Sequence, residues 1–357
     1  MPELTVVVPT FNRSQHLARC LRHFVVDEND LHIIIADGSN VPEHRRKNEA
    51  SVMRVKSDLN IEYIGFPSEL GFFQRCSEVA DQISTEYIVF HADDDFLFSS
   101  GMIAAAEFMD NNSEVTVTQG NIMHIGRGKN KLMNVATYPF SPIAIQDPVK
   151  RLKWHMRGYR PTFYSTHRRK NCAEALAATS KFTSPWLRFT EITASSLIAL
   201  QGQLGFVDVL YGVRESHPGA LSRNDMNWPD ILVHDNFSKT LQDYVDVVGP
   251  FIEEMNACCS PVDADKQARE AFLEFMKMVM IPQTRPIPQH IIDQTRSVLD
   301  IFENHSRHDN QRRLLSNAIA LINDPEYKRK STIKSAILSS IPYKSLLRGF
   351  SKKFRLN

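Results

Sequence analysis

Short apolar runs alternate with amphipathic stretches along roughly the first hundred residues of the chain. Strands rich in β-branched residues are predicted at residues 4–8, 31–36, 61–64 and 86–90. Helices are predicted at residues 14–24, directly after Ser39, and at residues 70–83. This alternation is typical of a parallel sheet with helices on both faces. The sequence therefore predicts an α/β domain.

The remaining two thirds of the chain become progressively more helical. A strand pair or one long strand is predicted at residues 114–125, a loop at 126–131, and a further strand at 204–213. Helices are predicted at residues 146–156, 168–178, 191–201, 264–280, 288–304 and 312–322. We expect an α/β domain at residues 1–245, a helical region at 246–327 and a basic amphipathic tail at 328–357.

Composition changes this picture little. Hydrophobic residues make up 42% and charged residues 23%, which is ordinary for a globular protein and excludes global disorder. Lys plus Arg is 42 and Asp plus Glu is 41, so overall charge gives no indication of a nucleic-acid partner. The five cysteines form no C-x-x-C pair, and neither a signal peptide nor a membrane-spanning run is evident. These features predict a cytoplasmic protein, at most peripheral on the inner face of a membrane.

Polar residues follow three of the predicted strands where each strand ends. They are Thr10 to Arg13, Asp37 to Ser39, and Asp93 to Asp95. Ligands bind beyond the carboxyl ends of strands in open parallel sheets, so these segments are expected to share one edge. Such a cluster suits a nucleoside diphosphate held with a divalent cation.

The Asp93–Asp94–Asp95 triplet is the strongest single feature. Adjacent carboxylates repel one another, and a hard cation such as Mg²⁺ or Mn²⁺ removes that cost. The alternative is a solvated turn that caps a following helix near Ser99 or Ser100. Asp37 could likewise be only a turn residue, because Asp-Gly is a common turn pair.

The order VVVPTFNR, IIIADGSN and EYIVFHADDD resembles the nucleotide-sugar-binding half of GT-A glycosyltransferases, family 2 type, over about residues 4–98. The resemblance implies a GT-A fold, which is Rossmann-like with a mostly parallel sheet flanked by helices, and here a helical C-terminal region. It implies Mn²⁺ or Mg²⁺ as the cofactor. Donor-binding roles are implied for Pro9, Thr10, Asn12, Arg13, Asp37, Arg75, Asp93 and Arg214, and metal-binding roles for Asp94, Asp95 and His217.

One departure leaves the aspartate register open. Ala92 stands where many members have the first aspartate of the run, so the working pair could be Asp93 with Asp95 or Asp94 with Asp95. We favour Asp94 on the metal and Asp93 towards the ribose. Asn12 and Arg13 could also be only loop and helix-start residues.

The acceptor side rests on a weaker match. The resemblance places a general base at Glu191, although Ile192 stands where an aspartate often follows. Glu191 could instead be an ordinary first-turn acid favoured by the helix dipole. Trp186 could stack on an acceptor or belong to the core. Downstream, His217 would complete the metal shell, and Arg214 and Arg223 would pair with phosphate.

The resemblance implies metal-dependent transfer of a sugar from a nucleoside-diphosphate donor, with UDP favoured, to an acceptor hydroxyl with inversion. The acceptor could be a saccharide, a lipid-linked molecule or a protein, and cell-envelope polysaccharide or glycoconjugate synthesis is the expected context. A non-catalytic nucleotide-sugar-binding protein is one alternative, supported by Ala92 and Ile192. A sugar nucleotidyltransferase is another, although VPTFNRSQ lacks the glycine-rich loop usual after the first strand of such enzymes.

The last thirty residues are strongly basic. Residues 328–357 contain nine Lys and Arg side chains and no acid, interleaved with Ile, Leu and Phe. A basic amphipathic segment of this kind can lie on an anionic membrane surface. A helix packed on the domain or a disordered end would give the same composition.

Overall fold

The computed structural model describes residues 2–27, 30–127, 132–138, 140–182, 184–217, 226–256, 259–280 and 309–322. The helix predicted at residues 288–304, Arg223 and the tail at 328–357 lie outside these ranges.

Within the described residues, nine strands form one sheet, in the order β3-β2-β1-β4-β8-β6-β9-β5 with β7 paired to β6. Their bounds are β1 Leu4–Thr10, β2 His32–Asp37, β3 Ile61–Gly65, β4 Tyr87–Phe90, β5 Phe96–Leu97, β6 Val115–Arg127, β7 Leu132–Tyr138, β8 Thr166–Arg168 and β9 Gln203–Ser216. Strands β3, β2, β1 and β4 are parallel, whereas β8 is antiparallel to both β4 and β6.

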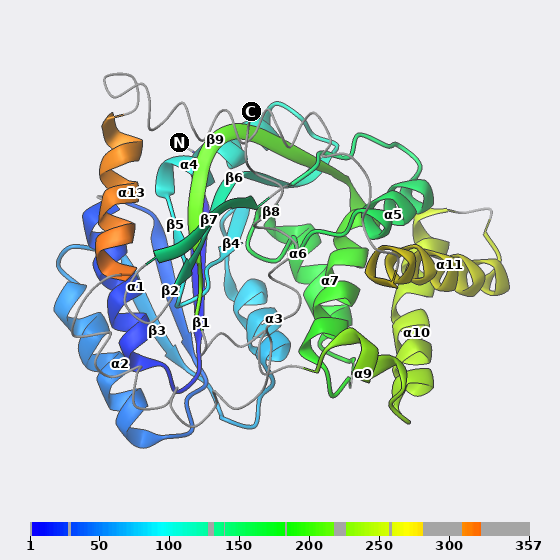
Figure 1. Cartoon of the computed structure of the whole chain (residues 1–357), viewed down its shortest axis with the longest axis horizontal. Helices are drawn as coiled ribbons and strands as arrows, with labels where there is room; N and C mark the ends of the chain where they lie inside the picture. Colours follow the sequence, from blue (N-terminus) through cyan, green and yellow to red (C-terminus); the bar gives the residue numbers. More distant parts are fainter. Residues whose placement is uncertain are drawn as a thin grey trace.

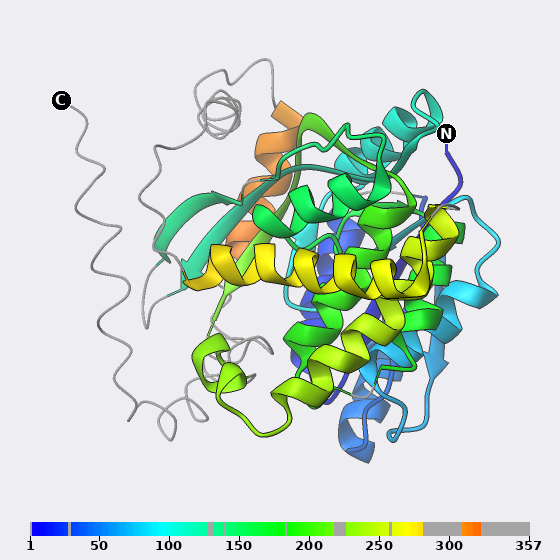
Figure 2. The same cartoon turned by 90° about the vertical axis from the view of Figure 1, so that its right-hand side faces the viewer.

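Helices cover both faces of this sheet (Figure 1). They are α1 Ser14–Asp27, α2 Pro42–Val55, α3 Phe72–Gln82, α4 Ser99–Asp110, α5 Pro148–Arg157, α6 Arg169–Thr179, α7 Leu187–Gln201, α9 Trp228–Leu232, α10 Phe237–Met255, α11 Pro261–Met280 and α13 Asp309–Ile322. Helices α1, α2 and α4 pack on one face, and α3, α6 and α7 pack on the other with α5, α10 and α11 outside them. In the view of Figure 2, α11 lies across the outside of this second layer.

Strand β1 shows why the chain folds in this way. Every residue of LTVVVPT is buried, and successive side chains point to opposite faces: Val7 belongs to one core, and Val6 and Val8 belong to the other. A strand buried on both faces needs a continuous apolar run, and β1 has one. The predicted α/β class of fold is confirmed.

Several boundaries differ from the prediction in ways that matter for the site. Helix α7 begins at Leu187, before the predicted start at Glu191. Strand β9 extends past Val213 to Ser216. Helix α10 runs continuously through residue 245, and its buried side chains Tyr244, Val245 and Val248 join the core that contains α7.

Two further observations bear on the overall expectations. The four cysteines in the described part of the chain, Cys20, Cys76, Cys172 and Cys259, are free thiols. Within the described ranges, every helix is too short or too polar to cross a lipid bilayer.

Candidate functional site

The carboxyl ends of β1, β2 and β4 meet at one edge of the sheet, as the sequence predicts. Thr10 pairs with Asp37 across β1 and β2, and the Gly38 amide donates to the Thr10 carbonyl at 3.1 Å. The Thr10 hydroxyl donates to Asp93 Oδ2 at 2.8 Å, beyond the end of β4. Thr10 therefore links all three strand ends in the centre of the site.

The three aspartates after β4 are buried rather than solvated. Their exposed fractions are 3%, 8% and 4% for Asp93, Asp94 and Asp95. Arg13 forms ion pairs with Asp93, at 3.0 Å, and with Asp94, whereas Arg214 Nε lies 3.2 Å from Asp95. Each carboxylate thus has a guanidinium partner, as a buried charge requires.

The alternative that this triplet caps the next helix is wrong. Helix α4 begins at Ser99, and the Ser99 amide donates to Asp27 Oδ2 at 2.7 Å. Asp27 is the last residue of α1, so the N-terminus of α4 is capped from a different helix. The triplet remains available for another role.

The three carboxyl groups differ in charge. Burial raises the pKa of Asp93 to about 6 and that of Asp95 to about 7, because Arg13 and Arg214 offset only part of the cost of burying an anion. Burial acts in the same direction on Asp94, but Arg13 and a hydrogen bond from His217 outweigh it, and the pKa of Asp94 lies well below its usual range. Asp94 is therefore the most strongly ionised of the three.

Two histidines converge on Asp94. His217 Nε2 lies 2.9 Å from Asp94 Oδ2, and the His217 ring stacks on that of His16 with centroids 5.0 Å apart. One potential ligand atom from each of His16, Asp94 and His217 lies within 4.8 Å of the other two. Burial, followed by the nearby Arg13, lowers the pKa of His16 well below its usual value, so its imidazole is neutral.

This set of donors fits a divalent transition metal. Two imidazole nitrogens and a carboxylate oxygen suit Mn²⁺ better than Mg²⁺, which prefers oxygen ligands. His217 and Asp94 are members of the predicted metal set, and the structure adds His16. Asp95, the third predicted ligand, is instead bonded to Arg214 and to the Glu215 amide, the latter at 3.0 Å.

A fully buried ion pair lies next to the acidic cluster and contacts its backbone. Arg19 on α1 lies 2.6 Å from Glu215 on β9, and both side chains have 0% exposure. Arg19 also donates to the Asp94 carbonyl at 2.9 Å. The extension of β9 beyond Val213 therefore anchors the backbone on which Asp94 and Asp95 stand.

The predicted nucleoside side of the site is more enclosed. Asp37 has 0% exposure, and its carboxylate accepts hydrogen bonds from Asn48, Tyr63 and the Ser39 amide at 2.7, 2.8 and 2.7 Å. These donors lower the pKa of Asp37 against the opposing effect of burial. The Ser39 hydroxyl is a fourth donor to this carboxylate, and because a carboxylate offers about four lone-pair positions, protein donors occupy about all of them.

Arg75 lies over the same strand end. Its guanidinium is 5.7 Å from the centre of the Phe11 ring and donates to the Leu70 carbonyl at 2.8 Å. A Cβ atom added to Gly38 would lie 2.3 Å from Arg75 Nη1, so only glycine allows this approach. Phe11, which is 39% exposed, is an apolar surface beside Arg75 and Gly38.

Two predicted donor-binding residues have structural contacts. Asn12 has a positive φ of 55°, a conformation that asparagine tolerates better than most residues. Its side chain bonds Asn40 and the Val41 amide, which joins the loops after β1 and β2. Pro9 lies within β1, paired with Ala36.

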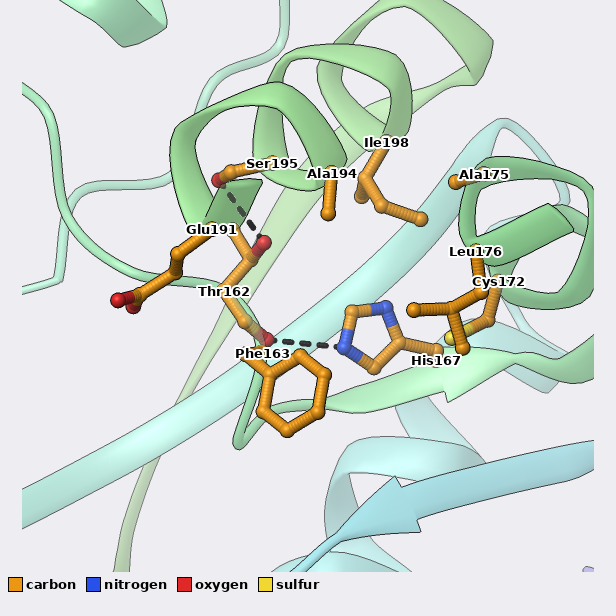
Figure 3. Close-up of a pocket in the computed structure, with 10 residues that line it drawn as sticks. All are labelled: Thr162, Phe163, His167, Cys172, Ala175, Leu176, Glu191, Ala194, Ser195 and Ile198. Carbon is orange, nitrogen blue, oxygen red and sulfur yellow. Dashed lines mark hydrogen bonds between the residues drawn. The ribbon is translucent and has the colours of Figure 1, made fainter. Parts of the chain in front are cut away.

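Glu191 lies in the second turn of α7, because that helix begins at Leu187. The interpretation of Glu191 as a first-turn acid is therefore wrong. Figure 3 shows its carboxylate pointing away from the small cavity that His167 and Ser195 line. Ile192, which follows it, is 2% exposed and belongs to the core.

Glu191 and two residues of the acidic cluster, Asp94 and Asp95, all affect the pKa of Tyr164. The Arg214 guanidinium lies 5.0 Å from the centre of the Tyr164 ring. Burial raises the pKa of Tyr164, and Asp95, Glu191 and Asp94 each add to the effect. Glu191 is thus near enough to act on the same phenol as the two aspartates. Trp186 is 4% exposed and packs against Phe189, which places it in the core.

The sequence contains a signal for His16, although His16 belongs to no metal-binding motif. His16 and Arg19 lie three residues apart on one face of α1, and Arg13 precedes the helix at the same interval. A charged stripe on the helix that follows β1 indicates polar groups turned towards the strand ends. His23, one turn further, is also fully buried, and its Nε2 lies 2.6 Å from the Leu97 carbonyl.

We expect Glu215→Gln to destabilise the protein by about 3–5 kcal/mol, because it leaves the buried Arg19 guanidinium without its counter-charge. Urea unfolding followed by circular dichroism measures the change in free energy. Glu43→Gln removes a carboxylate from the exposed Glu43–Lys47 pair and should leave the unfolding midpoint unchanged. Equal midpoints for the two variants would contradict the anchoring role of the Arg19–Glu215 pair.

Comparisons with known proteins agree with this geometry. Residues 5–173 match the family model described as glycosyl transferase family 2. No curated protein matches the chain closely in sequence.

Solved structures resemble the fold at low sequence identity. S. aureus TarS 1–349 in complex with UDP-GlcNAc has a TM-score of 0.52 and 12% identity, covering 90% of this chain and 91% of that one. A longer S. aureus TarS structure has a TM-score of 0.49 and 13% identity, covering 90% of this chain but 55% of that one, so this chain spans about half its length. The mannosyltransferase PcManGT from Pyrobaculum calidifontis, in complex with GDP-Man and Mn²⁺, has a TM-score of 0.43 and 11% identity, covering 91% and 88%.

The family match falls on the segment that contains β1, β2, β4 and the aspartate triplet, and the fold match extends over most of the chain. The chain therefore contains a glycosyl transferase family 2 domain of GT-A fold, and it is a glycosyltransferase.

Proposed function

We propose that this glycosyltransferase is metal-dependent and transfers a sugar from a UDP-linked donor to an acceptor hydroxyl. The observation that carries the proposal is the convergence of His16, Asp94 and His217 beside two guanidinium groups at the sheet edge. A diphosphate needs several positive partners at once, and this edge offers them.

His16, Asp94 and His217 would hold the cation. When bound, a divalent cation supplies Lewis-acid stabilisation for the charge that develops on a departing diphosphate. Arg13 is paired with Asp94 of this set and Arg214 with the neighbouring Asp95, and both would contact the phosphate oxygens. Fixed cations at the position where charge develops lower the barrier more than cations that must reorganise.

The uridine assignment rests on the strand ends of β1 and β2. Asp37 at the end of β2 is fully buried and accepts a hydrogen bond from the Ser39 amide, which would fix the loop that faces the base. Phe11 beside Arg75 offers an exposed ring for stacking against a base. The similarly folded TarS 1–349, whose structure contains UDP-GlcNAc, supports the same assignment.

We expect UDP with Mn²⁺ to raise the melting temperature more than GDP with Mn²⁺ or UDP with a chelator. A ligand at about 100 times its Kd stabilises the folded state by about 2.7 kcal/mol. Differential scanning fluorimetry across this panel measures the effect. Asp94→Asn is the control, because it should remove the benefit of Mn²⁺. A larger shift with GDP would overturn the uridine assignment.

Glu191 is our proposed general base, in a single displacement with inversion at the anomeric carbon. Its carboxylate lies on the α7 face turned away from the apolar cavity, and it shares Tyr164 as a neighbour with Asp94 and Asp95. A base in this place would take the proton from the acceptor hydroxyl on the side opposite the departing diphosphate.

Glu191→Gln should lower kcat by roughly 10²–10⁴-fold, the usual contribution of a positioned general base. Transfer from the UDP-sugar measures the rate, and isothermal titration with UDP and Mn²⁺ should give an unchanged Kd. Glu174→Gln, which changes a carboxylate on neighbouring α6 that is bonded to Gln201, is the matched control and should retain full activity. Full activity in the Glu191 variant would remove it from the base role.

We also propose that residues 328–357 associate with the anionic inner face of a membrane, which suits an acceptor in envelope synthesis. The support is compositional: nine cations and no acid among these residues. Each cation near an anionic surface contributes about 1 kcal/mol.

The full chain should therefore sediment with vesicles that contain phosphatidylglycerol, and a chain truncated after Glu326 should not. Neutral phosphatidylcholine vesicles and added salt serve as controls, because both weaken electrostatic attraction. Equal sedimentation of the two chains would exclude the tail as the contact.

A further inference from the structure

One nitrogen of Arg13 lies in the middle of the proposed metal-binding set. Arg13 Nη2 is 2.5 Å from Asp94 Oδ2, 3.5 Å from His217 Nε2 and 3.5 Å from His16 Nδ1. A single guanidinium nitrogen therefore reaches all three side chains that would ligate a cation.

We infer that Arg13 is an internal competitor of the metal: its guanidinium occupies the His16–Asp94–His217 set until a divalent cation displaces it. The inference rests on the proposed function, because it assumes that this set binds a cation. It adds a mechanism that controls when the cation can bind.

Electrostatic repulsion prevents the Arg13 guanidinium and a divalent cation from occupying the set at the same time. A guanidinium is always charged, offers only donors, and at these distances would repel a dication strongly in a site as buried as this one. Asp94 gains a counter-charge from either occupant, so its negative charge is compensated with or without metal. The protein thus avoids an unpaired buried carboxylate in the metal-free state.

The position of Arg13 allows its side chain to move out of the metal-binding set. It precedes α1, which begins at Ser14, and its side chain is 23% exposed, whereas Arg19 within α1 is fully buried. Its second partner, Asp93, lies 3.0 Å from Nη1 and does not belong to the metal-binding set. Rotation of the side chain could therefore release Asp94 while the contact with Asp93 is kept.

A diphosphate would favour that movement. Once displaced from Asp94, the guanidinium needs another anion, and bidentate pairing with phosphate oxygens suits its planar fork. Nucleotide and metal would then each help the other to bind, which is positive coupling between two ligands. The wild-type protein should bind Mn²⁺ weakly alone and more tightly with UDP.

The test measures Mn²⁺ binding directly, from the loss of the free-ion electron paramagnetic resonance signal, with and without UDP. The full-length wild-type chain is compared with Arg13→Ala, Arg13→Lys and Arg214→Ala. Arg214→Ala is the matched control, because it also removes one guanidinium from the acidic cluster, but from Asp95 rather than Asp94. Circular dichroism checks that each variant is folded.

We expect Arg13→Ala to bind Mn²⁺ without UDP roughly 10- to 100-fold more tightly than the wild type does, the range that one charge-assisted hydrogen bond corresponds to. Its affinity should then gain less from UDP. Arg13→Lys should fall between the two, because an ammonium keeps the charge without the fork. Arg214→Ala should change Mn²⁺ affinity much less than Arg13→Ala.

Two negative results are distinguishable. In the first, the wild type binds Mn²⁺ with UDP, but without UDP Arg13→Ala has no higher affinity for Mn²⁺ than Arg214→Ala. Competition by Arg13 is then wrong, and the metal assignment stands. If Mn²⁺ binds to no variant even with UDP, the metal in the proposed function is wrong, and the competition falls with it.

Discussion

The site depends on burying three adjacent carboxylates at the end of one strand. Like charges in consecutive positions repel, and each loses hydration when it is buried, so the arrangement is stable only where cations are delivered to it. Arg13 comes from the loop before α1, and Arg214 comes from the end of β9. Segments about two hundred residues apart in the sequence must therefore meet at this edge of the sheet.

That requirement explains several features of the fold around the site. Strand β9 continues to Ser216, still paired with β6, and Arg19 contacts it through Glu215 while also donating to the Asp94 carbonyl. The pair is fully buried and so adds little net stability by itself. Its effect is positional, because it fixes the backbone of the aspartates relative to α1 and β9.

The sequence predicted those parts of the molecule whose signals are local. Strands β1 to β4 follow from apolar runs, and the cluster at their carboxyl ends follows from the rule for parallel sheets. His16 could not be identified in the same way, because its role depends on which face of α1 meets the strand ends. The cap of α4 has no local signal either, because Asp27 is distant from Ser99 in sequence and meets it only through tertiary packing.

The structure also separates three residues that look equivalent in the sequence. Asp93 is bonded to Thr10 and Arg13, Asp95 is turned to Arg214 and the β9 backbone, and Asp94 faces the two imidazoles. Their pKa values diverge accordingly, with Asp94 lowered and the other two raised. The raised pKa values of Asp93 and Asp95 favour their neutral forms, which limits the repulsion around the strongly ionised Asp94. Asp94 is also the carboxylate on which the two imidazoles of the proposed metal-binding set converge, so the electrostatics that allow the triplet to be buried favour Asp94 for the proposed cation.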